Sequence, residues 1–161
     1  KQKQKIKRID TVSDIEIIPM EVSHIDEVVE IENLSFSLPW SRNSFMEEIT
    51  KNKYARYLTA KIGEKVVGYA GMWKIIDEGH ITNIAVHPEY RSQGVGKALL
   101  ESIIRLAKSE KILRITLEVR KSNIIAQALY LKYGFKVEGI RYNYYEDNGE
   151  DALIMWADII D

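Results

Sequence analysis

A change of hydrophobic period at Gly94 divides the middle of this sequence into two kinds of secondary structure. Before it, Ile81–Val86 is typical of a strand, and His87-Pro88 ends this strand because proline donates no hydrogen bond to a sheet. After it, the buried face of a helical pattern carries Val95, Leu99, Ser102, Ile103 and Leu106. The sequence therefore predicts a strand, a turn that contains Gly94 and Gly96, and then a long amphipathic helix.

The same kinds of signal predict the other elements. Helices are expected to start at Ser23, Ser41 and Asn123, which are residue types that cap helices, and the last of them to end at Gly134. Strands are expected at residues 15–20, 55–62, 66–76, 112–119, 135–145 and 152–159. Turns at residues 63–65 and 148–149 predict two antiparallel hairpins. The expected fold class is mixed α/β (α+β), with helices on both faces of one mixed sheet.

Size and charge limit the number of domains and the partners. A chain of 161 residues that is 45% hydrophobic is expected to form one domain, which we place at residues 15–161. Residues 1–14 are expected to be a flexible basic extension, because five Lys and Arg residues and no acid occupy the first eight positions. The rest of the chain carries 18 basic and 24 acidic residues. This balance argues against nucleic acid as the main partner.

The chain contains no cysteine, which excludes a disulfide scaffold, a thiolate zinc site and a cysteine nucleophile. No apolar stretch is long enough to span a bilayer, and the basic start is not followed by the apolar core of a signal peptide. The histidines His24, His80 and His87 share no ligand spacing, so surface or capping roles are expected and no metal site is predicted. We therefore expect a cytoplasmic protein that binds no membrane.

The turn before the long helix is a candidate anion site, because a helix start presents unpaired N–H groups and a positive dipole end. A dinucleotide-binding loop fits poorly, since Gly94-Val95-Gly96 is followed by Lys97 and Ala98. A phosphate-binding P-loop does not fit either, because it requires glycine in place of Arg91 and serine or threonine in place of Ala98. Taken alone, a Gly-x-Gly pattern more often marks a helix start that binds no ligand.

The pattern Arg91-x-x-Gly94-x-Gly96-Lys97-Ala98, which follows a strand and Pro88, resembles the acetyl-CoA loop of the GCN5-related N-acetyltransferase (GNAT) family. The resemblance implies the GNAT fold, with a central, mostly antiparallel sheet of about seven strands. It also implies that the loop amides bind the CoA pyrophosphate and that the preceding strand binds the pantetheine arm. The cofactor contacts implied are Ile84, Ala85, Val86, Arg91, Ser92, Gln93, Gly94, Val95, Gly96 and Lys97.

Within this family, the sequence is similar to the RimI-type ribosomal-protein alanine N-acetyltransferases from about Ile15 to Asp158. Residues 36–41 (FSLPWS), 117–123 (LEVRKSN) and 141–145 (RYNYY) carry this similarity. Leu38 and the basic extension depart from the RimI type, which usually has phenylalanine at that position. The resemblance also assigns Asn123 a further CoA contact.

The RimI resemblance implies direct acetyl transfer in a ternary complex to the N-terminal alanine of the eighteenth protein of the small ribosomal subunit. The alternatives are an acetyltransferase for another protein N-terminus, for lysine or for a small amine, or an acyl-CoA-binding module without catalysis. The presence of both acid–base candidates of the family favours an enzyme over a binding module.

Glu118 resembles the general base of the family and Tyr130 resembles its general acid. The residues alone leave other roles open, because a glutamate late in a strand commonly forms a salt bridge, here with Arg114 or Arg120. Tyr130 could be a core aromatic residue, and Tyr133 competes for the acid role. In residues 112–119, alternation places Leu113, Ile115, Leu117 and Val119 opposite Arg114, Thr116 and Glu118.

Proton affinities constrain these assignments. A glutamate of pKa about 4.3 is too weak by about 5 kcal/mol to deprotonate an α-ammonium group of pKa about 8. Glu118 must therefore be made more basic by burial, act through water, or take the proton after attack on the thioester has begun. A tyrosine of pKa about 10 can protonate a thiolate of pKa about 8.5 at a cost of about 2 kcal/mol.

Two further sets of residues have alternative interpretations. Trp40 and Phe45 either line the acceptor groove, as their family position suggests, or fasten the second helix to the core. Four acidic residues surround the turn at residues 148–149, and they form either a solvated hairpin tip or a patch that steers a basic peptide. These four residues are Glu146, Asp147, Glu150 and Asp151.

Overall fold

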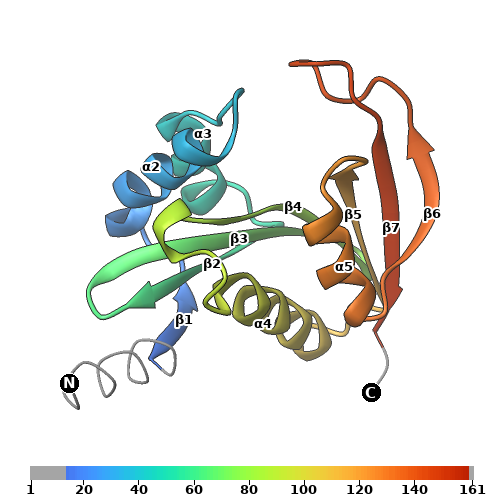
Figure 1. Ribbon diagram of the computed structural model, residues 1–161. Helices are drawn as coiled ribbons and strands as arrows, with labels where there is room; N and C mark the ends of the chain where they lie inside the picture. The colour runs from blue at the N-terminus through green and yellow to red at the C-terminus, as the bar shows by residue number, and fades with distance from the viewer. Residues whose placement is uncertain (1–13, 160–161) are drawn as a thin grey trace, which may run out of the picture. The chain divides into compact units, whose positions relative to one another are not determined.

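Seven strands form one sheet within residues 14–159, the residues that this computed structural model describes (Figure 1). The strand order is β1-β2-β3-β4-β5-β7-β6. The predicted mixed sheet is thus confirmed, whereas the predicted extension lies outside the described residues except for Asp14. In chain order the elements are β1 (Ile15–Pro19), the 3₁₀ turn η1 (Val22–His24), α2 (Ile25–Ser35), α3 (Arg42–Thr50), β2 (Ala55–Ile62), β3 (Lys65–Ile75), β4 (Glu78–Val86), the 3₁₀ turn η2 (Pro88–Tyr90), α4 (Val95–Ser109), β5 (Arg114–Arg120), α5 (Ile124–Lys132), β6 (Lys136–Arg141) and β7 (Ala152–Asp158).

The described residues divide into two compact units. The first unit comprises residues 14–71 and 83–103, and the second comprises residues 72–82 and 104–159. The strands β3 and β4 and the helix α4 contribute residues to both units. Each unit is described in turn below.

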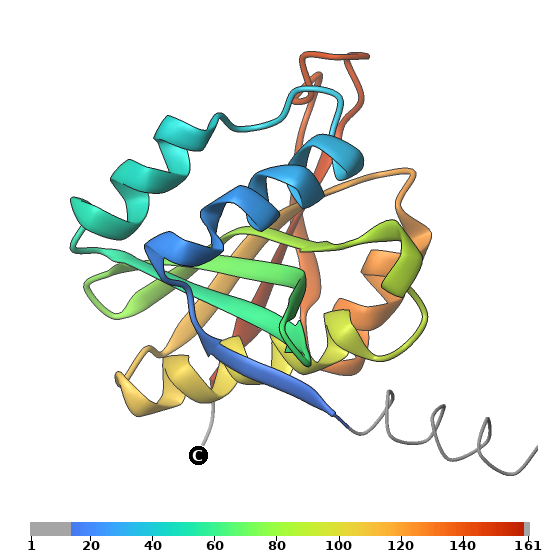
Figure 2. The same cartoon turned by 90° about the vertical axis from the view of Figure 1, so that its left-hand side faces the viewer.

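In the first unit, α2 and α3 cover one face of the strands and the start of α4 covers the other (Figures 1 and 2). The antiparallel pairing of β1 with β2 runs from Ile15 opposite Ile62 to Pro19 opposite Leu58. Gly68 of β3 allows α4 to pack closely, because a Cβ atom there would lie 3.0 Å from Val95 Cγ1.

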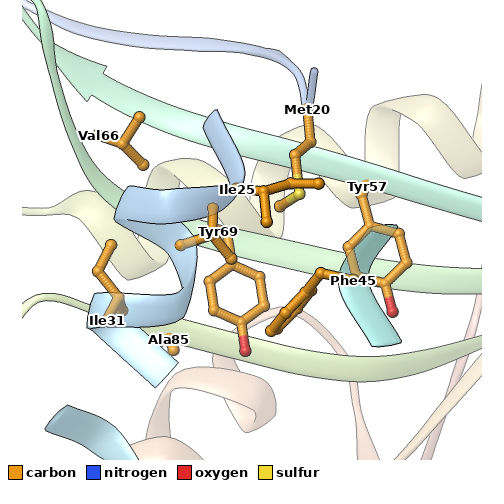
Figure 3. Packing of buried hydrophobic residues seen from close by; sticks show 9 residues of the cluster. Met20, Ile25, Ile31, Phe45, Tyr57, Val66, Tyr69 and Ala85 are labelled. Carbon is orange, nitrogen blue, oxygen red and sulfur yellow. The ribbon is translucent and has the colours of Figure 1, made fainter. Parts of the chain in front are cut away.

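The core of the first unit lies between α2, α3 and the strands (Figure 3). Phe45 from α3 is fully buried, and its ring lies edge-on to the rings of Tyr57 and Tyr69, with centroids 6.4 Å and 5.5 Å away. Aliphatic side chains of α2 complete this cluster, because its inward face carries apolar residues at helical spacing. The other buried members are Met20, Ile25, Val28, Ile31, Val66 and Ala85.

In the second unit, β7 lies between β5 and β6 and is antiparallel to both (Figure 1). The start of β4 pairs in parallel with β5, with Glu78 opposite Arg114 and His80 opposite Thr116. A register shift between Val137 and Gly139 bends β6. The strand β5 alternates as predicted, so Ile115, Leu117 and Val119 are buried and the side chain of Glu118 lies on the opposite face.

Two local predictions differ from the structure. Ser23 does not cap a helix, because Glu21 and His24 form a reciprocal capping box around η1 and His24 precedes α2. Leu113 is 58% exposed rather than buried, and Ile112 is buried instead. The cause is the positive φ of 61° at Lys111, which turns the chain before β5 begins at Arg114.

The last hairpin also differs from its prediction. The strands β6 and β7 pair as expected, but β6 ends at Arg141 and residues 142–151 form a long connection. A tight turn does occur at its tip, where Gly149 has a φ of 71° and its N–H donates to the carbonyl of Tyr145. Pairing stops early because acidic side chains of the connection turn back toward β5 and bind Arg120.

Candidate active site

The predicted cofactor loop forms the N-terminus of α4 in the first unit. The N–H of Ala98 donates to the carbonyl of Gly94 at 3.0 Å, so the N–H groups of Val95, Gly96 and Lys97 precede the first bond of this kind in the helix. The φ angles of Ser92 and Gly94 are 63° and 85°. Left-handed backbone conformations at alternate residues are typical of nests, which are concavities of backbone N–H groups that bind anions.

Two cations flank this loop. Arg91 and Lys97 are exposed, and neither forms an ion pair with any other residue of positions 14–159. The Nε–H of Arg91 donates to the carbonyl of Val86 at 3.2 Å. This bond holds the guanidinium group beside the loop. An anion bound here would meet backbone donors, a helix dipole and two positive charges.

The strand residues predicted to bind the cofactor lie directly before this loop. Ala85 is buried in the core of the first unit, while Ile84 and Val86 are half-buried (Figure 3). Ala85 therefore has only its backbone to offer a ligand. Gln93 is held by a hydrogen bond from its side-chain amide to the carbonyl of Glu89, at 3.5 Å.

Asn123 caps α5 in the second unit, as predicted. Its Oδ1 accepts a hydrogen bond from the N–H of Ala126 at 3.1 Å. The carboxamide oxygen of this residue is thus used by the helix, and the amide nitrogen is the group left to bind a ligand.

Glu118 lies in a cluster of polar side chains in the second unit. Its side chain is only 10% exposed, and its Oε2 lies 2.8 Å from Nε2 of His80. On the other oxygen, the hydroxyl of Tyr144 donates to Oε1 at 3.3 Å, and Nε of Arg141 lies 3.9 Å away. The predicted partners Arg114 and Arg120 are instead bound to other acidic residues.

The surroundings of Glu118 oppose one another in their effect on its pKa. Burial is the largest single influence and favours the neutral acid, but the hydrogen bond and charge of His80 oppose it. The charge of Arg141 and the hydrogen bond from Tyr144 act in the same direction as His80. Together these three residues hold the pKa of Glu118 below its ordinary value. Burial alone would make Glu118 more basic, but the net effect of its surroundings is the opposite, so the first of the three predicted alternatives does not apply.

His80 is the site residue that the sequence analysis missed. The predictions were right for two histidines, because Nδ1 of His24 and of His87 each accept a capping N–H, at 2.9 Å and 3.1 Å. For His80, which is 33% exposed, the structure adds a contact that was not predicted, because its ring binds a carboxylate rather than capping a helix. The contact was missed because the strand was predicted to begin at Ile81. In the structure β4 begins at Glu78, so His80 lies within the strand.

Tyr130 lies in α5 with its ring 5.7 Å from that of Phe135. Burial raises the pKa of Tyr130 to about 12. The residue as a whole remains half-buried, so its packing and its hydroxyl are both compatible with the predicted acid role. The neighbouring Tyr133 ends the helix as its C-cap residue.

The segment on the predicted acceptor side is anchored to a buried carboxylate of the first unit. Glu32 is 1% exposed and accepts hydrogen bonds from the hydroxyl of Tyr69 and from the N–H of Trp40, the latter at 2.9 Å. Phe45 is a core residue and not part of a groove. Trp40 is half-buried and packs on Phe45 with ring centroids 5.6 Å apart, so the pair helps to fasten α3 to the core, while a groove-lining role of Trp40 stays a prediction.

The acidic tip is not a fully solvated hairpin end. Asp147 and Glu150 lie 2.8 Å and 3.3 Å from the guanidinium of Arg120, which also stacks on the ring of Tyr145. Asp151 accepts a hydrogen bond from the N–H of Asn143. These bonds make the tip a structural element of the β6–β7 connection.

The described part of the chain holds neither a metal-binding cluster nor a membrane-spanning helix. Residues 14–159 contain no group of three or more His, Cys, Asp or Glu side chains arranged to hold a metal ion. No helix in the same stretch is both long enough and apolar enough to cross a membrane.

Comparison with known proteins identifies the family. The profile of the acetyltransferase (GNAT) family matches residues 25–135. A protein of Bacillus subtilis (strain 168) named putative [ribosomal protein bS18]-alanine N-acetyltransferase is 49% identical over 87% of this chain and 93% of its own length. The [ribosomal protein bS18]-alanine N-acetyltransferase of Escherichia coli (strain K12) is 37% identical over 86% of this chain and 94% of its own.

Solved structures agree with the sequence matches. The crystal structure of the ribosomal-protein-S18-alanine N-acetyltransferase from Escherichia coli has a TM-score of 0.84, with 34% identity over 91% of this chain and 95% of its own. Ard1 from Thermoplasma volcanium has a TM-score of 0.84, with 26% identity over 92% of this chain and 99% of its own. The predicted family and fold are therefore confirmed, and the chain belongs to the GNAT family of acetyltransferases.

Proposed function

We propose that this acetyltransferase transfers the acetyl group of acetyl-CoA to the N-terminal alanine of ribosomal protein bS18. The observation that carries the proposal is the 49% identity to a relative named for this acceptor, over nearly the whole of both chains. A second relative at 37% identity is named for the same acceptor. We place the reaction in the cytoplasm, where bacterial ribosomal proteins are made.

The loop before α4 fits the cofactor, whose reactive part is an acetyl thioester. The amides of Val95, Gly96 and Lys97 would bind the pyrophosphate, and the side chains of Arg91 and Lys97 would neutralise its charge. Gly94 has no Cβ atom to obstruct the approach of the phosphates, and its φ of 85° suits glycine. Ser92 and Gln93 complete the loop, while Ile84, Ala85 and Val86 would bind the pantetheine arm through their backbone.

Glu118 would accept the proton that the amine loses. Because its pKa is lowered, Glu118 is ionised at neutral pH but too weak to deprotonate an ammonium group in advance. The amine must therefore bind in its neutral form and give up its proton after the C–N bond has begun to form, when the nitrogen is acidic. About a tenth of an α-amine of pKa about 8 is neutral at pH 7, against about one in 10³ for a lysine side chain. This difference favours an N-terminal acceptor.

Tyr130 would donate a proton to the departing thiolate. Its pKa of about 12 keeps it protonated at every physiological pH. Transfer to a thiolate of pKa about 8.5 then costs about 5 kcal/mol, more than the value for an unperturbed tyrosine. A turnover of about 10 per second corresponds to a barrier of about 16 kcal/mol, so this cost is tolerable. Asn123, at the start of the same helix, would contribute a further hydrogen bond to the cofactor.

Mass spectrometry of acetylated peptides tests the proposal. The substrate is a peptide with the N-terminal residues of bS18 and one internal lysine, and the matched control is the same peptide with a formylated N-terminus. We expect acetylation of the N-terminal alanine and none of the blocked peptide. Acetyl groups on lysine alone would overturn the proposed acceptor, and acetyl-CoA binding without turnover on any amine would indicate a binding module.

The variant Glu118→Gln tests the proton acceptor in the same assay. We expect its kcat to fall by about 10²- to 10⁴-fold, the usual contribution of a general base. Its affinity for acetyl-CoA should stay within about twofold, because the cofactor loop contacts are unchanged. An undiminished kcat would exclude Glu118 as the base.

A further inference from the structure

His80 is a polar residue that the proposed chemistry does not yet use. Its Nε2 lies 2.8 Å from Oε2 of Glu118, which is the shortest of the three polar contacts to this carboxylate. The side chain of His80 is 33% exposed, so it can exchange protons with water. The contact therefore joins an imidazole ring, which can bind a second proton, to the predicted base.

The sheet itself creates this contact. His80 stands opposite Thr116 in the parallel register of β4 and β5, and Glu118 follows two residues later on the same face. On its other side, the ring of His80 packs edge-on against Trp73 of β3, with centroids 6.1 Å apart. Because both neighbours lie on strands, the imidazole is held in one orientation.

The distance determines where a proton must be. Two lone pairs cannot face each other at 2.8 Å, so a hydrogen atom lies between Nε2 and the ionised carboxylate. In neutral His80 this is the Nε2–H, and Nδ1 carries the lone pair. Protonation at Nδ1 then converts the ring to a cation without changing the hydrogen bond.

We propose that His80 is a positioning residue for acetyl transfer, which orients the Glu118 carboxylate through Nε2–H and weakens it as a base when Nδ1 gains a proton. The inference rests on the proposed function of Glu118. The amine proton passes to Glu118, Nε2 keeps its own hydrogen throughout, and the carboxyl group later releases the proton to water. The charged and titratable groups around the pair are Arg141 of β6 and both Tyr144 and Tyr145 of the β6–β7 connection, while β3 supplies the uncharged Trp73.

Protonation of His80 should appear as an extra dependence of the rate on pH. The acceptor amine must be neutral, so kcat/KM falls about tenfold per pH unit below about pH 8 in any variant. In the wild type, a cation at His80 steepens this fall, because it weakens Glu118 as a base. The raised pKa of Tyr144 keeps its hydroxyl protonated across this range, so Tyr144 does not contribute to the steeper fall.

Two substitutions separate the hydrogen bond from the titration. His80→Gln keeps an N–H donor but cannot titrate, so we expect kcat at pH 8 within about threefold of wild type and a single slope below it. His80→Phe keeps the ring packing on Trp73 but loses the donor, so we expect kcat to fall at least about tenfold at every pH, with KM for acetyl-CoA unchanged. His24→Gln, which changes a capping histidine of the first unit, should show the same pH dependence of kcat/KM as the wild type.

An NMR measurement on the wild-type protein decides the proposal without using activity. We expect the ¹⁵N resonances of His80, assigned by their loss in His80→Gln, to show hydrogen on Nε2 when the ring is neutral. We also expect the ¹³C resonance of the Glu118 carboxyl group to move together with the ¹⁵N resonances of His80 when the ring gains a proton. A neutral ring with hydrogen on Nδ1, or a pH profile of His80→Phe equal to that of wild type, would overturn the proposal. If no peptide is acetylated, the proposed function fails, but the NMR spectra still show whether His80 donates a hydrogen bond to Glu118.

Discussion

Removal of the Tyr69 hydroxyl group tests whether a buried carboxylate anchors the segment before α3 that contains Trp40. This hydroxyl donates to Glu32, which also accepts the N–H of Trp40. Burial raises the pKa of Tyr69 well above 10, so the group remains a donor at any pH of interest. In Tyr69→Phe the ring contact with Phe45 is kept and one hydrogen bond to a buried charge is lost.

The expected loss of stability follows from this geometry. Glu32 is 1% exposed, so water cannot replace the missing donor, and a bond to a buried charged group contributes about 1.5–3 kcal/mol. We therefore expect Tyr69→Phe to lower the free energy of unfolding by about 2–3 kcal/mol at pH 8. In a domain of this length, such a change lowers Tm by about 5–10 °C.

The pH dependence of this loss has a definite sign. Burial outweighs the bonds from Trp40 and Tyr69 and raises the pKa of Glu32. An acid whose folded pKa exceeds its unfolded value loses folding stability as pH rises between the two. Removal of one bond raises the folded pKa further, so the penalty of Tyr69→Phe should be larger at pH 8 than at pH 5.

Tyr57→Phe is the matched control. Tyr57 also packs on Phe45, but its hydroxyl donates at 3.0 Å to Glu48, a half-buried carboxylate that water can reach. We expect a loss of about 0.5–1 kcal/mol for this variant. Urea unfolding of both variants at pH 5 and pH 8 is the assay. Equal losses in the two variants, or a Tyr69→Phe penalty independent of pH, would refute the reasoning.

Three further changes have definite expected outcomes. Gly94→Ala should weaken acetyl-CoA binding in calorimetric titrations about 5- to 30-fold, because a φ of 85° costs a non-glycine residue about 1–2 kcal/mol. The control Gly63→Ala, with a φ of 61° in the β2–β3 turn, should bind acetyl-CoA normally. Glu118→Gln should lower the free energy of unfolding in urea above about pH 5, because the folded state stabilises only the ionised carboxylate. This loss of stability should shrink as pH falls through the lowered pKa of Glu118, and a loss that grows on acidification would contradict the reasoning. Arg120→Ala should make residues 142–151 a site of protease cleavage, since two acidic side chains lose their partner, and equal cleavage rates in Arg120→Ala and Lys121→Ala would count against this role.

Elements that depend on local patterns were predicted well. The helical period after Gly94 predicts α4, the alternation around Leu117 predicts the burial pattern of β5, and Asn123 caps α5 as expected. In each case the neighbours that decide the structure lie within a few residues along the chain. The turn predicted at Gly94 is also present, with a φ of 85° that few residues other than glycine adopt without strain.

Elements that depend on distant partners were predicted less well. The strand β6 was expected to reach Tyr145, but Arg120 of β5 draws Asp147 and Glu150 away from a regular hairpin. Ser23 has the right residue type for a cap, but the side chain of His24 competes for the same helix start. Propensity describes what a residue tolerates, and tertiary contacts decide between tolerated alternatives.

The site chemistry shows the same division between residue identity and environment. Glu118 and Tyr130 could be proposed from the sequence, but their pKa values depend on burial and on neighbours such as His80, far away in the chain. The surroundings move the two pKa values apart, downward for Glu118 and upward for Tyr130. Divergence of this kind keeps a base ionised and an acid protonated at the same pH, which is the assignment that acetyl transfer requires. Since both shifts also weaken the driving force for proton transfer, the chemistry must depend on amines that arrive neutral, and α-amines meet this condition far more often than lysine side chains.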